Sequence, residues 1–332
     1  MDVKIGNINL GKFPLLLAPM EDVSDPPFRA ICKEYGADMM YTEFISSEGL
    51  IRDADKSIQK LDIYSFERPI GIQIFGNNIE SMKKATSICE EANPDVIDIN
   101  YGCPVKKVAC KGAGAGILQD IPKMVRMTKE IVSTTNIPVT VKTRLGWDDN
   151  SRYIVEIAER LQDVGIKAIS IHGRTRKQMY KGDADWSLIG DVKNNQRMCI
   201  PVFGNGDIDS AEKAVAMKNQ FGIDGIMIGR ATIGYPWIFN EIKHFMQTNS
   251  PLAKPSISDR VDICKKHLIH SINWKGEYLG IVETRRHYTN YFKGIPDFKP
   301  YKKQLVTSME KNELLEILDT IRNKFNHINF NS

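Results

Sequence analysis

Short apolar runs rich in β-branched residues alternate with longer amphipathic stretches through the first two thirds of this 332-residue chain. Alternation of this kind predicts parallel strands covered by helices. Strands are expected at 15–18, 39–42, 70–75, 96–99, 139–142, 168–172, 202–204 and 225–228, and helices at 79–91, 122–133, 153–164 and 210–220. Eight such repeats, without a doubly wound fingerprint, predict a (β/α)8 TIM barrel, a fold that needs about 250 residues.

A second, smaller region follows the barrel pattern. Prolines and serines interrupt the pattern at 249–258. Beyond them, amphipathic helices are expected at 259–273, 282–292 and 310–325. We therefore predict two domains, a catalytic barrel over 1–245 and a small C-terminal helical domain over 256–330.

Charge is distributed unevenly between these two regions. From Lys243 onward the chain has 15 Lys and Arg against 9 Asp and Glu, whereas the residues before it have 30 against 32. A basic appendage beside a near-neutral barrel is typical of an enzyme that binds a polyanion, although a merely solvated basic face has the same composition.

Composition argues against a membrane-spanning or disulfide-stabilised protein. No run approaches the roughly 18 apolar residues that a membrane span needs. Residues 1–11 lack the basic start and apolar stretch of a secretory signal. Six cysteines are too sparse for a disulfide framework in a chain of this length. We therefore expect a soluble, cytoplasmic protein with reduced cysteines.

Polar side chains stand at the ends of most of the expected strands. They are Glu43, Gln73, Asn100, Lys142 with Arg144, His172, Asn205 and Arg230. The carboxyl ends of barrel strands share one face, and active sites form there. The convergence of these ends predicts a catalytic site at that face.

The segment 100–104, Asn-Tyr-Gly-Cys-Pro, directly follows the fourth expected strand. We expect Gly102 and Pro104 to hold Cys103 in a tight turn, exposed at the barrel mouth, where a thiol can take part in chemistry. One alternative is a small buried hydrophobe, a common fate of free cysteine. A zinc site shared with Cys110 is disfavoured because no second ligand pair is nearby, so no metal is expected.

Two glycine-containing loops, 203–207 and 228–231, follow the seventh and eighth expected strands. Loops at these strands form the phosphate site common in such barrels, since glycine lets the backbone approach phosphate oxygens. Arg230 can add a charged fork. The loops predict a phosphorylated ligand or a mononucleotide cofactor.

Three further strand-end side chains suit a ligand. Lys142 can form a Schiff base or stabilise negative charge on a reduced cofactor ring. His172 is expected to contact the ligand rather than pack in the core. The neutral amide of Gln73 suits hydrogen bonding to a polar heterocycle.

Several motifs in this order and spacing resemble the tRNA-dihydrouridine synthase family. They are Ala18-Pro-Met20, Asp25-Pro-Pro-Phe-Arg29, Asp98-Ile-Asn-Tyr-Gly-Cys-Pro104, His172-Gly-Arg-Thr-Arg176, Asn205-Gly-Asp207 and Gly229-Arg230. Thr284-Arg-Arg-His287 looks like the bacterial branch. The chain departs from the family at Glu21-Asp22, where many members have a small residue and a glycine.

The resemblance implies an FMN-dependent enzyme that NADPH reduces. The flavin would pass a hydride to carbon 6 of a D-loop uridine, and Cys103 would protonate carbon 5 from the opposite side. An unperturbed thiol, with a pKa of about 8.5, stays protonated near neutral pH and can donate. The residues that would contact FMN are Pro19, Met20, Glu21, Gln73, Lys142, His172, Asn205, Gly206, Asp207, Gly229 and Arg230.

The target uridine lies inside a folded tRNA and must leave its stack to react. The residues expected to contact the tRNA are Asn100, Lys106, Lys107, Arg174, Arg176, Arg285 and Arg286. Of these, Arg174 and Arg176 are favoured for the nucleotide itself because they directly follow the sixth strand. We expect the enzyme to act as a monomer.

Three other functions fit parts of the pattern. A dihydroorotate dehydrogenase-like FMN barrel acting on a small molecule would explain the phosphate loops but not the basic appendage. A Schiff-base lyase would use Lys142 and need no flavin. A non-catalytic RNA-binding barrel would not need Cys103, Lys142 and both phosphate loops together.

Overall fold

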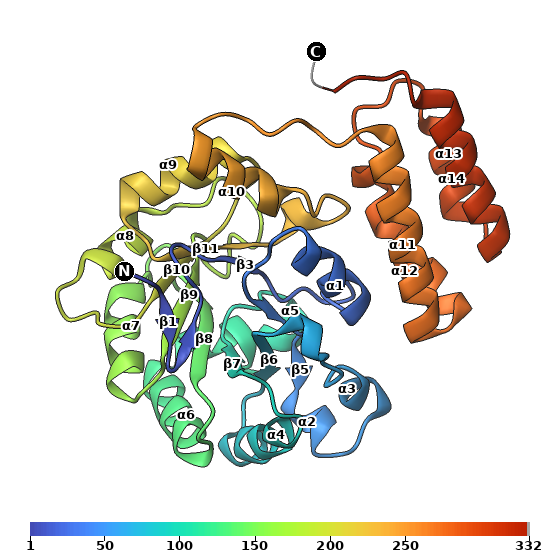
Figure 1. Ribbon diagram of the computed structural model, residues 1–332. Helices are drawn as coiled ribbons and strands as arrows, with labels where there is room; N and C mark the ends of the chain where they lie inside the picture. Colours follow the sequence, from blue (N-terminus) through green and yellow to red (C-terminus); the bar gives the residue numbers. More distant parts are fainter. Residues whose placement is uncertain (331–332) are drawn as a thin grey trace.

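Eight parallel strands form a nearly closed barrel at the centre of the computed structural model, which describes residues 1–330 (Figure 1). They are β3 (Leu15–Leu17), β4 (Met40–Tyr41), β6 (Ile70–Phe75), β7 (Val96–Asn100), β8 (Val139–Arg144), β9 (Ala168–His172), β10 (Val202–Asn205) and β11 (Gly225–Ile228). Strands that follow one another along the chain are neighbours in the barrel, and β11 pairs with β3. A parallel bridge between Leu16 and Met39, the residue before β4, connects β3 to β4. The predicted barrel is confirmed.

Helices alternate with these strands and cover the barrel from outside (Figure 1). They are α1 (Pro26–Glu34), α4 (Ile79–Glu91), α6 (Ile121–Thr134), α7 (Ile154–Asp163), α8 (Ser187–Asn194), α9 (Ala211–Phe221) and α10 (Ile238–Thr248). Their apolar faces pack on the outward side chains of the strands, such as Ile72, Ile97 and Val141. No helix within 1–330 is long and apolar enough to cross a membrane.

Shorter elements fill the loops between the barrel strands. They are β5 (Ile45–Ser46), α2 (Ser47–Leu50), α3 (Asp55–Gln59), η1 (Ser65–Glu67), α5 (Lys106–Ala109), η2 (Gly114–Gln119) and η3 (Arg230–Thr232). At the end of the barrel opposite the mouth, the hairpin of β1 (Lys4–Ile5) and β2 (Ile8–Asn9) packs Ile5 against barrel-interior side chains. The hairpin closes that end, so the mouth is where a ligand can enter.

The barrel interior has an apolar base and a polar upper part, because alternate residues of each strand point inward. The base contains Val96, Ala168 and Phe203. Above Val96, the next inward residues of β7 are Asp98 and then Asn100. The strand register sets Asp98 beside Gln73 and Thr140, and Asn100 beside Lys142. A buried polar layer therefore lies directly beneath the mouth.

The C-terminal region is a cluster of four helices beside α1 (Figure 1). They are α11 (Ile257–Lys275), α12 (Glu277–Tyr291), α13 (Lys299–Thr307) and α14 (Lys311–Phe325). They share a core that includes Val261, Leu268, Tyr288 and Leu318. Helix α13 lies between the second and third expected helices of this region, where no helix was expected. Pro300 is compatible with it because a proline in the first helical turn needs no backbone N–H.

The helical cluster and the barrel meet through polar and aromatic contacts. Lys275 forms ion pairs with Asp25 of the barrel, at 2.5 Å, and with Glu283. The ring of Phe28 on α1 packs against His267 and His287. These contacts attach the cluster to the loop after β3, which forms one side of the mouth.

Candidate active site

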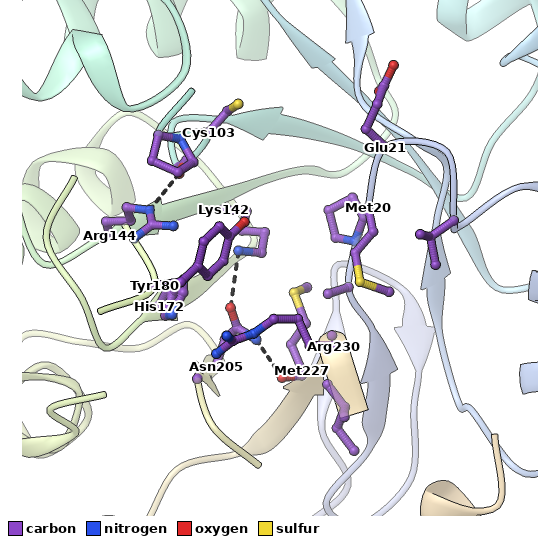
Figure 2. A pocket seen from close by; sticks show the side chains of 18 of the residues that line it. Met20, Glu21, Cys103, Lys142, Arg144, His172, Tyr180, Asn205, Met227 and Arg230 are labelled. Carbon is purple, nitrogen blue, oxygen red and sulfur yellow. Dashed lines mark hydrogen bonds between the residues drawn. The ribbon is translucent and has the colours of Figure 1, made fainter. Parts of the chain in front are cut away.

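A cavity of about 450 Å³ opens at the carboxyl ends of the barrel strands. Figure 2 shows side chains from several of these strand ends facing one another across it. The predicted site residues that line it are Pro19, Met20, Glu21, Asn100, Cys103, Lys142, His172, Asn205, Gly206, Asp207, Gly229 and Arg230. Residues far apart in the sequence therefore meet at one face, as expected for the fold.

Cys103 lines this cavity but is buried, with 7% of its surface exposed, so the expectation of an exposed thiol is wrong. The η2 segment covers it: Ala115 N donates to the Cys103 carbonyl at 3.0 Å. A methyl group on Gly114 would lie 3.0 Å from Cys103 Cβ, and Gly114 has φ +52°, so only glycine suits that position. The backbone and Cβ of Cys103 are therefore packed against a loop that follows it in sequence.

Burial raises the pKa of the Cys103 thiol above its ordinary value. The Val105 N–H and the cations Arg144 and Lys142 oppose this effect, while Glu21 adds to it. The thiol is therefore neutral near pH 7, which is the state that a proton donor needs.

Lys142 reaches the cavity as a cation with a neutral partner. Its Nζ donates to Asn205 Oδ1 at 3.2 Å, and Asn205 Nδ2 donates to the Met227 carbonyl at 2.8 Å, which fixes the direction of the amide (Figure 2). Burial, then Arg144, lowers the pKa of Lys142 to about 8. No carboxylate within 1–330 forms an ion pair with it. The site therefore favours an anionic group in the cavity.

Arg144 and Tyr180 also line the cavity. The sequence placed Arg144 at the same strand end as Lys142 without a specific role, and it did not single out Tyr180. Arg144 Nε donates to the Gly102 carbonyl at 2.7 Å, and Nη1 donates to the carbonyls of Thr175 and Met179. Burial lowers the pKa of Arg144 to about 10. Strand β8 runs two residues beyond its predicted end, which places Arg144 on the same face as Lys142. The alternation of inward and outward side chains along a strand, with a period of two, is the sequence signal for this position of Arg144.

Tyr180 lies on the loop between β9 and α8 and is 52% exposed. Its ring centroid is 5.7 Å from the guanidinium carbon of Arg144 and 4.9 Å from that of Arg230. In Figure 2 it stands between these two arginines. An aromatic residue in an irregular loop gives no periodic signal, so the sequence could not place it.

The opposite side of the cavity is built around the Asp207 carboxylate. Arg174 binds both carboxylate oxygens, at 2.9 and 2.6 Å, and Arg230 Nη2 donates to Oδ1 at 2.8 Å. Burial raises the pKa of Asp207, but hydrogen bonds from Arg174 and the Ala184 N–H outweigh it, so that the pKa is lowered. Asp207 and Gly206 both have positive φ, which turns this loop toward the cavity.

Arg174, which was expected to contact the nucleotide, is 2% exposed and does not line the cavity, so the structure gives that contact no support. Its partner Asp207 lies 33 residues further along the chain, on the next barrel loop.

Arg174 also fixes the tautomer of His172. Arg174 Nη1 lies 3.3 Å from His172 Nε2. Since arginine can only donate, Nε2 accepts and Nδ1 carries the proton. Burial, then the cations Arg144 and Lys142, lowers the pKa of His172 well below its usual value, so the ring is neutral.

Gln73 is fully buried and is not among the residues that line the cavity, and its contact with a cofactor stays a prediction. The strand register puts it level with Asp98, one layer below the mouth. Asn100 does line the cavity, but its amide is engaged in holding the Cys103 turn. The polar layer thus supports the site from beneath.

The other residues expected to contact tRNA lie outside the cavity. Lys106 and Lys107 are exposed at the start of α5. Arg176 is half-buried, with its guanidinium carbon 4.7 Å from the ring centroid of Trp147. Arg285 donates to the Ser308 carbonyl at 3.0 Å, inside the helical cluster. Arg286 is exposed and lies 3.4 Å from Asp22.

Within residues 1–330, the carboxylates of Glu21, Asp22 and Glu43 lie within 4.8 Å of one another. Lys60 forms ion pairs with Glu21 and Glu43, and the Asp22 N–H donates to Glu43. Lys60, with Arg286 beside Asp22, therefore offsets part of the negative charge of this group. Cys103 and Cys110 are free thiols and belong to no such group among the described residues.

Comparison with known structures supports the fold. The chain superposes on histamine dehydrogenase from a Rhizobium species with a TM-score of 0.58, over 81% of this chain and 50% of that chain at 13% identity. A morphinone reductase variant gives a TM-score of 0.51, over 78% of this chain and 92% of that chain at 11% identity. At such low identities only the barrel architecture is shared.

Sequence comparison is far more specific. The chain is 38% identical to tRNA-dihydrouridine synthase B of Shewanella oneidensis, over 95% of this chain and 97% of that protein. It is 40% identical to tRNA-dihydrouridine synthase B of Vibrio cholerae, over 87% and 89% of the two chains. The family profile described as dihydrouridine synthase (Dus) matches residues 16–326. Together with the thiol and the basic cavity, these matches establish that the chain belongs to the dihydrouridine synthase family.

Proposed function

We propose that this enzyme reduces the 5,6 double bond of a D-loop uridine in tRNA, with Cys103 as the proton donor at carbon 5. The observation that carries the proposal is a buried, neutral thiol on the wall of a cavity that also contains the cation Lys142. A neutral thiol suits proton donation, whereas a nucleophilic cysteine requires a lowered pKa.

The family is FMN-dependent, and the cavity residues fit that cofactor. The buried Lys142 lacks a carboxylate partner within 1–330 and would face the polar edge of the ring system. The backbone at Gly206 and Gly229, with Arg230, would hold the phosphate, while Met20 and Met227 supply apolar surface. When bound, FMN supplies the hydride that is added at carbon 6 of the uracil. NADPH is the reductant that the family resemblance implies.

The protein's own groups account for the proton. Hydride addition at carbon 6 leaves enolate-like negative charge that must collect a proton at carbon 5. Cys103 supplies that proton and becomes a thiolate. The Val105 N–H, Arg144 and Lys142 all favour the charged form of the thiol, so they stabilise the product of the transfer.

RNA binding would use positive surface around the mouth and on the helical cluster. Lys106, Lys107 and Arg176 border the mouth, and Arg286 lies where the cluster meets the loop after β3. Such contacts bind phosphate without reading sequence. We infer that the enzyme works in the cytoplasm, where its free cysteines stay reduced, and that it acts as a monomer.

The decisive experiment maps dihydrouridine in tRNA from cells that lack this protein. We expect at least one D-loop dihydrouridine to revert to uridine, and to return when the wild-type chain is supplied but not when Cys103→Ala is supplied. An unchanged dihydrouridine map would refute the proposal. Efficient reduction of free uracil or uridine by the purified holoenzyme would instead favour a small-molecule reductase.

A further inference from the structure

The segment 229–234, which we call the β11 loop, connects the cavity to the helical cluster. Gly229, Arg230, Ala231 and Ile233 line the cavity. The last two residues of the loop contact helix α12 of the cluster. The helical cluster therefore contacts the same short segment whose backbone would bind the FMN phosphate.

Helix α12 holds both polar groups of one peptide unit in this loop. Asn290 Nδ2 donates to the Ile233 carbonyl at 2.7 Å, and the Gly234 N–H donates to His287 Nδ1 at 3.1 Å. This carbonyl and this N–H belong to the peptide bond between Ile233 and Gly234, which is planar. Since both ends of its dipole are bound, the orientation of the peptide plane is fixed by α12.

The loop also lies directly on the backbone of α12. Gly234 has φ +64°, a conformation that favours glycine. A methyl group at this position would overlap the His287 carbonyl oxygen and lie 3.0 Å from the Tyr291 backbone nitrogen. A displacement of α12 would therefore displace the loop with it.

Hydrogen bonds inside the loop connect this anchored peptide to the proposed phosphate site. The N–H and the hydroxyl of Thr232 both donate to the Gly229 carbonyl at 2.8 Å, and Thr232 is fully buried. The Tyr235 N–H donates to the Thr232 carbonyl at 2.9 Å. Gly229 and the anchored peptide are thus parts of one tight turn, and a change at one end alters the other.

His287 is suited to this contact because its ring is neutral. Burial, then the neighbouring His267, lowers the pKa of His287 well below its usual value. In the neutral ring, Nδ1 accepts from Gly234 and Nε2 carries the proton. Loss of the acceptor would leave the Gly234 N–H unpaired in a buried position, which is unfavourable.

We infer that His287 and Asn290 are positioning residues for the cofactor, which hold the β11 loop in the conformation that binds the FMN phosphate. The helical cluster then contributes to flavin retention as well as to RNA binding. This inference rests on the phosphate site given under the proposed function. It also gives His287, the last residue of the motif Thr284-Arg-Arg-His287, a role at the barrel and not at the RNA surface.

The test compares FMN with riboflavin, which has the same ring system without the phosphate. His287→Phe keeps an aromatic ring and removes the acceptor, whereas His287→Asn removes the ring and keeps an acceptor near the position of Nδ1. We expect His287→Phe to weaken FMN binding about tenfold, because binding must then order a loop that is no longer held. Its affinity for riboflavin should change less than about twofold, and His287→Asn should stay within about threefold of wild type for both ligands. Quenching of flavin fluorescence on titration of the apoprotein measures all of these affinities.

His267→Phe is the matched control. His267 packs at the same interface, at 5.4 Å from the Phe28 ring, but its Nδ1 lies 3.2 Å from the Tyr291 hydroxyl. The ratio of FMN affinity to riboflavin affinity should therefore stay at the wild-type value in this variant. Equal losses for FMN and riboflavin in His287→Phe, or a selective loss of FMN in the control, would show a general packing defect and overturn the positioning role. A selective loss in His287→Asn as large as in His287→Phe would refute the role of the acceptor.

A second variant covers the case in which His287→Phe does not fold. Asn290 is half-buried, and Asn290→Leu removes the donor to the Ile233 carbonyl at similar side-chain size. FMN affinity should fall at least about threefold, again without an equal loss of riboflavin affinity. Unchanged FMN affinity in this variant would overturn the inference.

The binding data also separate this inference from the proposed function. A wild-type protein that binds riboflavin as tightly as FMN would refute the phosphate site, and the inference with it. A wild-type protein that shows the expected selectivity but forms no dihydrouridine in tRNA would overturn the proposed activity alone.

Discussion

The two walls of the cavity carry similar numbers of cations but treat them differently. On the wall formed by β7 and β8, Lys142 and Arg144 donate to neutral groups, an amide oxygen and backbone carbonyls, and neither forms an ion pair among residues 1–330. On the wall formed by the loops after β9, β10 and β11, Arg230 lines the cavity and shares the Asp207 carboxylate with Arg174, which is buried. The first pair can act on charge that develops in the cavity, whereas much of the second pair's charge is already neutralised.

This difference assigns the walls different tasks. Uncompensated cations beside a neutral thiol suit a step in which negative charge appears and is then protonated. Arginines that clamp a carboxylate give a stiff frame, from which backbone N–H groups can bind a phosphate. Substitutions on the first wall should therefore change the chemistry, and those on the second should change the retention of FMN.

The largest effect should follow from Cys103→Ala on the first wall. Loss of a positioned general acid typically lowers a rate between about 100-fold and 10,000-fold. We expect a loss in that range for dihydrouridine formation in tRNA, while bound FMN and its reduction by NADPH persist. Retention of more than about a tenth of the wild-type rate would mean that another group delivers the proton.

On the second wall, Asp207→Ala should weaken the frame. It leaves Arg174 buried without its carboxylate, and breaking a fully buried pair costs about 3–5 kcal/mol. Asp207 is 19% exposed, so the free-energy cost should be smaller than this. We expect a fall of several degrees in the melting midpoint and a weaker affinity for FMN. Arg230→Ala is the matched control for the melting midpoint of the apoprotein, because it removes a cation that is 54% exposed and leaves the Arg174 pair intact. An equal fall in that midpoint in both variants would contradict the framing role of the buried pair.

The same contrast explains what the sequence could predict. All eight strands were placed within about two residues because each is a short apolar run between longer amphipathic stretches. Their position at the ends of such runs also placed Lys142, His172 and Asn205 at the mouth. It did not reveal that Gln73 is buried level with Asp98, because the register between neighbouring strands decides the layer and is not written in either strand alone.

Contacts between distant loops account for the remaining differences. Cys103 is buried because Gly114 and Ala115, eleven and twelve residues later, pack over it. Arg174 is buried because Asp207 on another loop binds it. Each residue follows a strand, and position after a strand indicates the correct face of the barrel. Exposure depends on partners that local patterns do not identify.

A smaller effect concerns the charge of Lys142 on the first wall. Its pKa is lowered to about 8, so its positive charge is lost as the pH rises through that value. If the charge assists the chemistry, the single-turnover rate should fall above pH 8, and Lys142→Met should remove this fall while lowering the plateau.

The same pKa shift also affects stability. Between about pH 8 and the ordinary lysine pKa of about 10.4, the unfolded chain binds more protons than the folded one, so the stability of the apoprotein should rise with pH. An identical rise in Lys142→Met would show that another group causes it.

The smallest effect should come from the exposed lysines outside both walls. Each phosphate contact contributes about 0.9 to the slope of log affinity against log salt concentration. If Lys106 and Lys107 each bind a phosphate, changing both to Gln should reduce the magnitude of that slope by about two and weaken tRNA binding severalfold at low salt. The matched control is Lys84→Gln, since Lys84 is equally exposed but lies on α4, which covers the outside of the barrel. A wild-type slope in the double variant would mean that these two lysines do not contact the RNA. Arg176 and the helical cluster would then supply the contacts. Neither outcome should alter Cys103 chemistry on tRNA already bound at saturation, because the two lysines contribute nothing to the cavity.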